Sequence, residues 1–224
     1  MSATASNFVD RADAGRQLAQ RLSSIPLAHP VVYALPRGGV PVAAEVARAL
    51  KAPLDLVLVR KIGAPGAPEL ALGAIVDGNR PQTVINEDVR RQFGVDDAWL
   101  ERAQDRELAE IERRRVRYYG GRAQIAPKGR TAVLVDDGLA TGATMKAAVT
   151  ALQRQAASKV VIAVPVAAAD ALPPIEDVAD LVICLRPEKW FRGVGGYYDD
   201  FHQLTDEETI GLLREAWSED PSRR

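Results

Sequence analysis

The sequence is poor in cysteine, in aromatic residues and in net charge. Cys184 is the one cysteine in 224 residues, and aromatic residues make up 5% of the chain. A single cysteine cannot form an internal disulfide, and within the apolar run LVICL it is expected to pack as a small hydrophobic side chain. The 29 lysines and arginines nearly balance the 30 aspartates and glutamates. The formal net charge of −1 therefore gives no general reason to expect nucleic acid or an anionic membrane as a partner.

Long hydrophobic runs are also absent. No stretch approaches the roughly 18 consecutive apolar residues of a membrane span, and the first residues lack the apolar centre of a signal peptide. We therefore expect a soluble cytoplasmic protein without a membrane partner. The composition, with 47% hydrophobic and 26% charged residues, is ordinary for a globular protein. The length predicts one domain, residues 1–224, with a substantial core.

The most informative stretch is TAVLVDDGLATGATM, residues 131–145. Its apolar run is typical of a strand buried on both faces. Asp136 and Asp137 follow, and a turn rich in glycine and threonine, residues 138–144, then opens a helix. The free amides and roughly half a positive charge at a helix N-terminus favour a phosphate, whereas carboxylates favour hydroxyl groups or a hard cation. A sugar phosphate combines both kinds of group.

This stretch resembles the signature with which type I phosphoribosyltransferases bind 5-phosphoribosyl 1-pyrophosphate (PRPP). Its DDGLATGAT core is most similar to the adenine phosphoribosyltransferase version. The resemblance implies that Asp136 and Asp137 hold the ribose hydroxyls, directly or through Mg²⁺. The alternative is a buried strand that enters a helix with a capping aspartate. The residues implied to cradle the 5′-phosphate are Ala140, Thr141, Gly142, Ala143 and Thr144.

A second strand-to-helix turn, PRGG, lies between a predicted strand at residues 31–35 and a predicted helix at residues 40–50. The planar guanidinium of arginine suits phosphate oxygens. By resemblance this turn is the pyrophosphate-binding loop of the same enzymes, which places Arg37, Gly38 and Gly39 on the leaving group. Taken alone, glycines after a strand are ordinary turn residues.

The stretch LDLVLVRKI, residues 54–62, predicts a further strand of the parallel sheet, with Lys61 at its carboxyl end, where ligands of such sheets bind. LVRKIG resembles the segment that supplies a lysine to PRPP in adenine-type enzymes. The resemblance implies a phosphate or pyrophosphate contact for Lys61, and a solvated strand exit is the alternative. Residues 63–76 begin with prolines and glycines and predict an irregular loop, which in the family closes over the site. Glu69 on this loop is equally suited to a ligand contact and to solvent.

Residues 83–121 depart from the compact family pattern and predict a helical insertion. Most of it is a long charged helix over residues 97–118, which could make dimer contacts, and a homodimer is expected. The run RRRVR, residues 113–117, could bind anions or nucleic acid. Its acidic neighbours favour an ion-paired exposed face instead.

The stretch EKWFRGVGGYYDDF, residues 188–201, gathers aromatic residues around three glycines. Such a loop can offer a stacking surface for a flat ring, and it resembles the family's hood, residues 187–204, where the nucleobase binds. A small hydrophobic satellite cluster is the alternative. The implied base contacts are Trp190, Phe191, Val194 and Asp199, and the implied metal ligands are Asp136, Asp137 and Asp199.

The alternation of predicted strands and helices indicates an α/β fold, an open parallel sheet flanked by helices. The type I phosphoribosyltransferase fold adds a small hood and, in this chain, the helical insertion. The predicted core covers residues 25–76 and 129–186. Thr205 and Glu208 predict a capping box at the start of the last helix.

The resemblance implies a Mg²⁺-dependent glycosyltransferase of nucleotide salvage that moves 5-phosphoribose from PRPP to a purine or related nitrogenous base and releases pyrophosphate. Ala140 stands where 6-oxopurine members carry an aspartate, which disfavours hypoxanthine and guanine, whereas the VGGYYDD run of the hood is similar to those members, so the two cues conflict. The competing hypothesis is a PRPP-binding regulator without turnover, with residues 113–117 on nucleic acid. A regulator needs no base pocket, so the hood favours the enzyme. The implied catalytic residues are Asp136, Asp137, Arg37 and Lys61.

Overall fold

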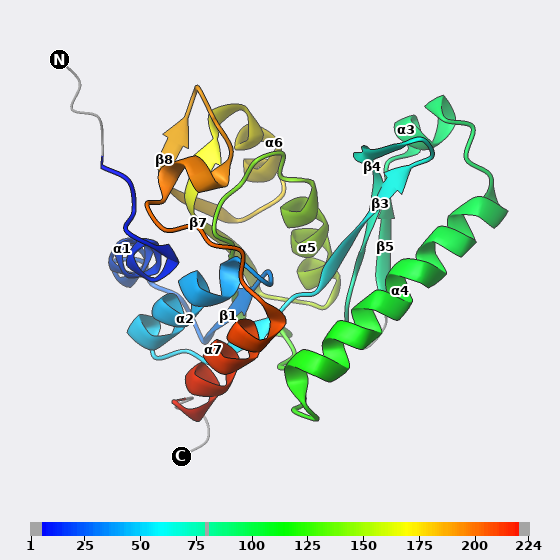
Figure 1. Ribbon diagram of the computed structural model, residues 1–224. Coiled ribbons are helices and arrows are strands. Elements are labelled where there is room, and N and C mark those ends of the chain that lie inside the picture. Colours follow the sequence, from blue (N-terminus) through cyan, green and yellow to red (C-terminus); the bar gives the residue numbers. More distant parts are fainter. Residues whose placement is uncertain (1–5, 79–80, 220–224) are drawn as a thin grey trace.

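The computed structural model describes residues 6–78 and 81–219, so residues 1–5, 79–80 and 220–224 of the predicted domain lie outside the described part. Five parallel strands form the central sheet, in the order β2-β1-β6-β7-β8 (Figure 1). The predicted parallel α/β fold is confirmed. The strands are β1 (Pro30–Ala34), β2 (Leu54–Leu56), β6 (Thr131–Val135), β7 (Lys159–Ala168) and β8 (Leu181–Glu188).

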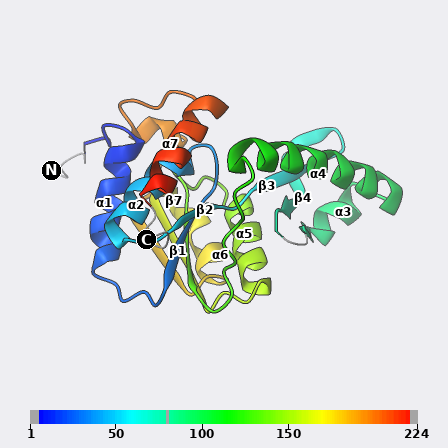
Figure 2. The same cartoon turned by 90° about the horizontal axis from the view of Figure 1, so that it is seen from below.

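Helices cover both faces of this sheet: α1 (Arg11–Ser23), α2 (Gly39–Leu50), α5 (Ala143–Arg154), α6 (Pro173–Glu176) and α7 (Asp206–Ser218). Val133 and Val135 of β6 pack with α1, α2 and α7, whereas Ala132 and Leu134 pack with α5 and α6. Successive side chains of a strand point to opposite faces, so an apolar run buries both. Figure 2 shows α1, α2 and α7 on one side of the strands and α5 on the other.

The last helix, α7, begins as the sequence predicts. The Thr205 hydroxyl accepts a hydrogen bond from the Glu208 amide at 3.1 Å, and the Glu208 carboxylate accepts one from the Thr205 amide at 2.7 Å. The capping box is therefore confirmed. Trp217 near the end of α7 donates its indole N–H to the carbonyl of Leu54 at 2.9 Å, which fixes the helix against β2.

Residues 54–76 differ from the prediction. The run at residues 54–62 is not one strand, because β2 ends at Leu56 and the chain then enters a separate antiparallel sheet. The predicted irregular loop at residues 63–76 is wrong as well, since most of it is a strand. The proline and glycine cluster closes a tight hairpin, in which Gly66 has a φ of +71°, a value that glycine adopts readily. The strands of this sheet are β3 (Val59–Ala64), β4 (Ala67–Val76) and β5 (Gln82–Ile85).

This second sheet and the helices α3 (Glu87–Gln92) and α4 (Asp97–Tyr119) form an arm, residues 59–78 and 81–119, that projects from the body (Figure 1). The predicted long helix of the insertion is confirmed as α4. At its end Tyr119 donates a 2.7 Å hydrogen bond to the buried Asp55 and stacks on Trp217 with ring centres 5.9 Å apart. The base of the arm is thereby joined to β2 and α7. Within residues 6–78 and 81–219, no helix is both long and apolar enough to cross a membrane.

Candidate functional site

The two predicted ligand-binding turns lie side by side because their strands are neighbours. Ala34 at the end of β1 is paired with Val135 at the end of β6, and the Leu35 amide donates to the Val135 carbonyl at 3.0 Å. The turn after β1 touches the acidic pair after β6. A Cβ atom on Gly38 would lie 2.0 Å from Oδ2 of Asp137, so this approach requires a residue without a side chain.

Gly39 makes an equally close contact with backbone atoms and gives a testable prediction. A Cβ atom there would lie 2.7 Å from the Val135 carbonyl oxygen and 3.0 Å from Cα of Asp136. Backbone atoms cannot turn away as a side chain can, so Gly39→Ala is expected to lower the free energy of unfolding by about 1–3 kcal/mol in urea denaturation. Gly211→Ala is the control, because this helical glycine has no atom within 4 Å of the added Cβ. The control is expected to gain up to about 1 kcal/mol. An unchanged stability of Gly39→Ala would contradict the close packing of the two turns.

Asp136 and Asp137 are mostly withdrawn from solvent. Burial, followed by the neighbouring charge of Asp137, raises the pKa of Asp136 well above its usual range. Burial also raises the pKa of Asp137, and the nearby Arg11 guanidinium opposes that rise. The Asp137 amide donates to Oδ1 of Asp136 at 2.9 Å, which orients the first carboxylate. Asp137 is in addition held by a cation of the protein itself.

That cation is Arg11, the first residue of α1. It is 8% exposed, and its Nε lies 2.8 Å from Oδ2 of Asp137. Its Nη1 donates to the His202 carbonyl at 3.0 Å, and its guanidinium lies 3.8 Å from the centre of the Phe201 ring. Arg11 thus links the acidic pair to the hood segment. Arg11 and Asp137 are separated by 126 positions in sequence, so no local pattern could have revealed their contact.

The predicted phosphate loop lies at the surface. Ala140, Thr141, Ala143 and Thr144 are exposed, and Gly142 before α5 has a φ of +74°. The loop is fixed from below by Leu139, which is buried. Its amide donates to the Val166 carbonyl and its carbonyl accepts from the Ala168 amide, both at 2.9 Å. The first turn of α5 has no side-chain cap, so its amides suit an anion.

The predicted pyrophosphate contacts come from two different parts of the molecule. Arg37 follows β1 and lies 3.8 Å from Asp206 of α7. Lys61 belongs to β3 of the arm and lies 3.3 Å from Glu69 across the hairpin. A cavity of about 370 Å³ between the arm and α5 is lined by Lys61, Thr144 and other residues of both elements. The structure therefore brings Lys61 and the phosphate loop to one cavity, which does not include Arg37.

Aromatic side chains of the hood segment pack against one another. Phe191 stacks on Tyr197 with ring centres 5.6 Å apart, and Val194 lies against Gly138. Tyr197 belongs to a small buried cluster with Phe8 and Tyr198, as in the alternative interpretation of the sequence. Trp190 differs, because it is 87% exposed.

Asp199 is exposed and is not gathered with the acidic pair. In the described part of the chain, no three or more histidine, cysteine, aspartate or glutamate side chains come together as a metal site. The three-carboxylate set of Asp136, Asp137 and Asp199 is therefore not formed. Two carboxylates together with substrate oxygens remain a suitable ligand set for Mg²⁺.

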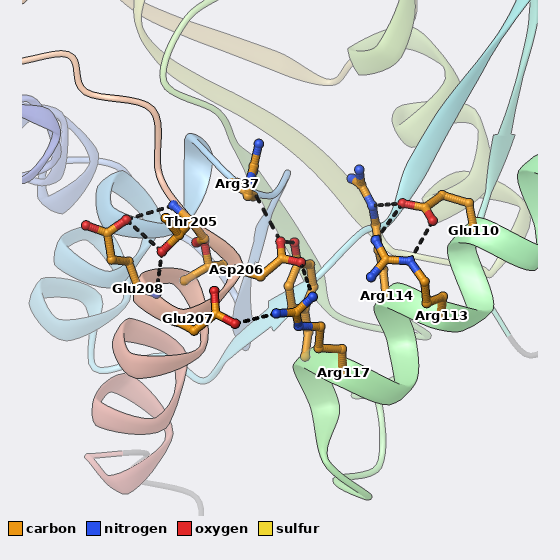
Figure 3. A network of polar contacts seen from close by, with 11 residues as sticks. Arg37, Glu110, Arg113, Arg114, Arg117, Thr205, Asp206, Glu207 and Glu208 are labelled. Carbon is orange, nitrogen blue, oxygen red and sulfur yellow. Dashed lines mark hydrogen bonds and ion pairs between the residues drawn. The ribbon is translucent and has the colours of Figure 1, made fainter.

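The arginine run of α4 is an ion-paired face (Figure 3). Glu110 lies 2.7 Å from both Arg113 and Arg114, and hydrogen bonds from these two arginines lower the pKa of Glu110 to about 2. Arg117 pairs with Asp206 at 2.8 Å and with Glu207. These contacts confirm the ion-paired interpretation of the run, and they leave little reason to assign it to nucleic acid.

Comparisons with known proteins agree on one family. The family model described as Phosphoribosyl transferase domain matches residues 6–202. A Mycobacterium tuberculosis protein, with the provisional name of a phosphoribosyl transferase, is 48% identical over 210 residues, which cover 93% of this chain and 47% of the relative. The chain thus spans about half the length of that relative. The crystal structure of TT1426 from Thermus thermophilus superposes with a TM-score of 0.82 at 45% identity, and the match covers 93% of this chain and 98% of TT1426.

Proposed function

Because the chain belongs to the type I phosphoribosyltransferase family, we propose that it transfers 5-phosphoribose from PRPP to a nitrogenous base and releases pyrophosphate. The observation that carries the proposal is the pairing of β1 with β6. This pairing sets the acidic pair, the exposed phosphate loop and the PRGG turn beside one another. The acceptor in the proposal is a purine or a related nucleobase, and the role is nucleotide salvage in the cytoplasm by a homodimer.

The roles of the residues follow from the charges that develop as the bond to pyrophosphate breaks. Positive charge grows on the ribose and negative charge on the leaving group, so preorganised cations near the pyrophosphate lower the barrier. Arg37 and Lys61 have this task, and a single donor of this kind contributes about 3–4 kcal/mol. Mg²⁺ would bind Asp136 and Asp137 together with substrate oxygens and would neutralise part of the pyrophosphate charge.

The acidic pair and the loop after it bind the two ends of the ribose phosphate. Residues 140–144 receive the 5′-phosphate, and the exposure of all of them but Gly142, together with the uncapped first turn of α5, supports this role. Asp136 and Asp137 accept hydrogen bonds from the ribose hydroxyls, directly or through Mg²⁺. The Arg11 guanidinium favours the charged form of Asp137 and so opposes the rise of its pKa that burial causes. On the hood, Trp190 offers an exposed ring for stacking, with Phe191, Val194 and Asp199 as the further base contacts of the proposal.

Pyrophosphate release is the direct test. We expect release when the protein is incubated with PRPP, Mg²⁺ and one member of a panel of nucleobases, and no comparable release without a base. A transferase transition state forms only when the acceptor is present, so base dependence separates transfer from hydrolysis. PRPP binding without release for any base would instead support a PRPP-binding regulator and would refute the transferase proposal.

A further inference from the structure

Asp206, the first residue of α7, lies where three parts of the molecule meet (Figure 3). Arg117 of the arm lies 2.8 Å from Oδ2 of Asp206, and the Tyr118 hydroxyl donates to Oδ1 at 2.7 Å. Arg37 of the predicted pyrophosphate loop lies 3.8 Å from the same Oδ1. One carboxylate therefore joins the arm, the last helix and the loop after β1.

The three contacts are unequal. Arg117 and Tyr118 lie at hydrogen-bond distance, whereas the Arg37 contact is longer. The side chain of Arg37 is 34% exposed and that of Asp206 is 17% exposed. Arg37 is therefore accessible to an anion from solvent while it contacts the more buried aspartate. Within residues 6–78 and 81–219, Asp206 is the acidic side chain that lies within ion-pair distance of Arg37.

The charge of Asp206 is stabilised without Arg37. Its position in the first turn of α7 places a carboxylate at the positive end of the helix dipole. Burial, followed by the hydrogen bond to Asp206, raises the pKa of Tyr118 to about 12, so the tyrosine remains a hydrogen-bond donor to this carboxylate. If Arg37 moves away, Asp206 therefore keeps its other partners and loses little.

We propose that Asp206 is a positioning residue that holds Arg37 in the absence of an anion and competes with pyrophosphate for it. The inference rests on the proposed function, because it takes Arg37 as a pyrophosphate contact. When pyrophosphate binds, the guanidinium of Arg37 exchanges the long contact with Asp206 for oxygens of the ligand. When pyrophosphate leaves, Asp206 receives Arg37 again, so the pairing weakens product binding and favours product release.

The test measures the affinity for inorganic pyrophosphate by calorimetry at a fixed Mg²⁺ concentration. We expect Asp206→Asn to bind pyrophosphate about threefold more tightly than the wild type, because a partly exposed ion pair of modest strength no longer competes. Glu207→Gln is the matched control. It removes the neighbouring carboxylate, which pairs with Arg117 and forms no ion pair with Arg37, and it should leave the affinity unchanged.

Arg37→Gln supplies the second arm of the test. In that background Asp206→Asn should no longer raise the affinity, because the gain acts through Arg37. A merely structural role of Asp206 would weaken binding in its variant, since a loosened α7 would leave the loop that carries Arg37 less well ordered. An affinity that is unchanged or lower in Asp206→Asn, with binding by the wild type intact, would overturn the inference and leave the proposed function standing. Absence of pyrophosphate binding by the wild type would overturn both.

A crystal structure of the wild type with pyrophosphate gives a readout that does not depend on the stability of a variant. Arg37 should then lie more than 4 Å from Asp206, beyond ion-pair distance, while Arg117 and Tyr118 keep their contacts. An intact pair of Arg37 and Asp206 beside bound pyrophosphate would refute the exchange.

Discussion

Asp136→Asn is expected to slow pyrophosphate release on the order of 10²-fold to 10³-fold while PRPP still binds. The substitution keeps the shape of the side chain and its capacity to accept one hydrogen bond. It removes the negative charge that stabilises the ribose as positive charge develops and that would hold Mg²⁺. Steady-state kinetics measures the rate of pyrophosphate release, and direct titration measures the binding of PRPP. Asp105→Asn on the exposed surface of α4 is the control for the chemical change and should keep full activity. Equal rates in the two variants would exclude Asp136 from the mechanism.

The same variant is expected to gain stability where it loses activity. Burial and the charge of Asp137 raise the pKa of Asp136, so the folded protein binds a proton more readily than the unfolded chain does. The free energy of unfolding of the wild type therefore falls as the pH rises from the usual aspartate pKa of 3.8 through the raised value. Asparagine does not titrate, so we expect a gain on the order of 1 kcal/mol near neutral pH, which shrinks as the pH falls through the raised pKa and is absent below the usual aspartate pKa. Urea denaturation at several pH values measures it.

Arg11→Met is expected to cost about 3–5 kcal/mol in the free energy of unfolding, because it leaves the mostly buried Asp137 carboxylate without its cation. The second effect is on activity. Arg11 lowers the pKa of Asp137, so its removal raises that pKa further and moves the acid limb of the pH–rate profile to higher pH. Urea denaturation and the pH dependence of pyrophosphate release check the two effects separately.

Arg16→Met supplies the comparison for Arg11→Met on the same helix. Arg16 is 55% exposed in its side chain and pairs with Asp13 one turn away at 3.5 Å, so its loss should cost less than about 1 kcal/mol. Similar losses in the two variants would show that the contact between Arg11 and Asp137 contributes no more than an exposed ion pair.

The sequence predicted those features that depend on neighbours in the chain. The strand, acidic pair, turn and helix of residues 131–154 appear as expected, because an apolar run, adjacent glycines and a helical pattern are all local signals. The capping box at Thr205 is local in the same way. The hairpin of β3 and β4 was missed because prolines and glycines mark a tight turn as readily as a long loop. Sequence alone does not distinguish the tight turn from the long loop.

The rest of the candidate site depends on contacts between distant residues. The contact of Arg37 with Asp206 and that of Arg11 with Asp137 join segments that no periodicity relates. The aromatic hood shows the same limit, since Phe8 comes from the N-terminal segment to complete the cluster with Tyr198. A pattern can name the residue types at a site, whereas their partners are set by how the elements pack.

The pairing of β1 with β6 also decides which unfolding events disrupt the binding turns. Both binding turns extend from the two strands at the heart of the sheet, each with a strand on its other side as well. Fraying of the arm or the hood would leave these turns in register, whereas separation of β1 from β6 would open the centre of the core. The phosphate loop and the PRGG turn should accordingly persist through local opening and disappear together with the global fold.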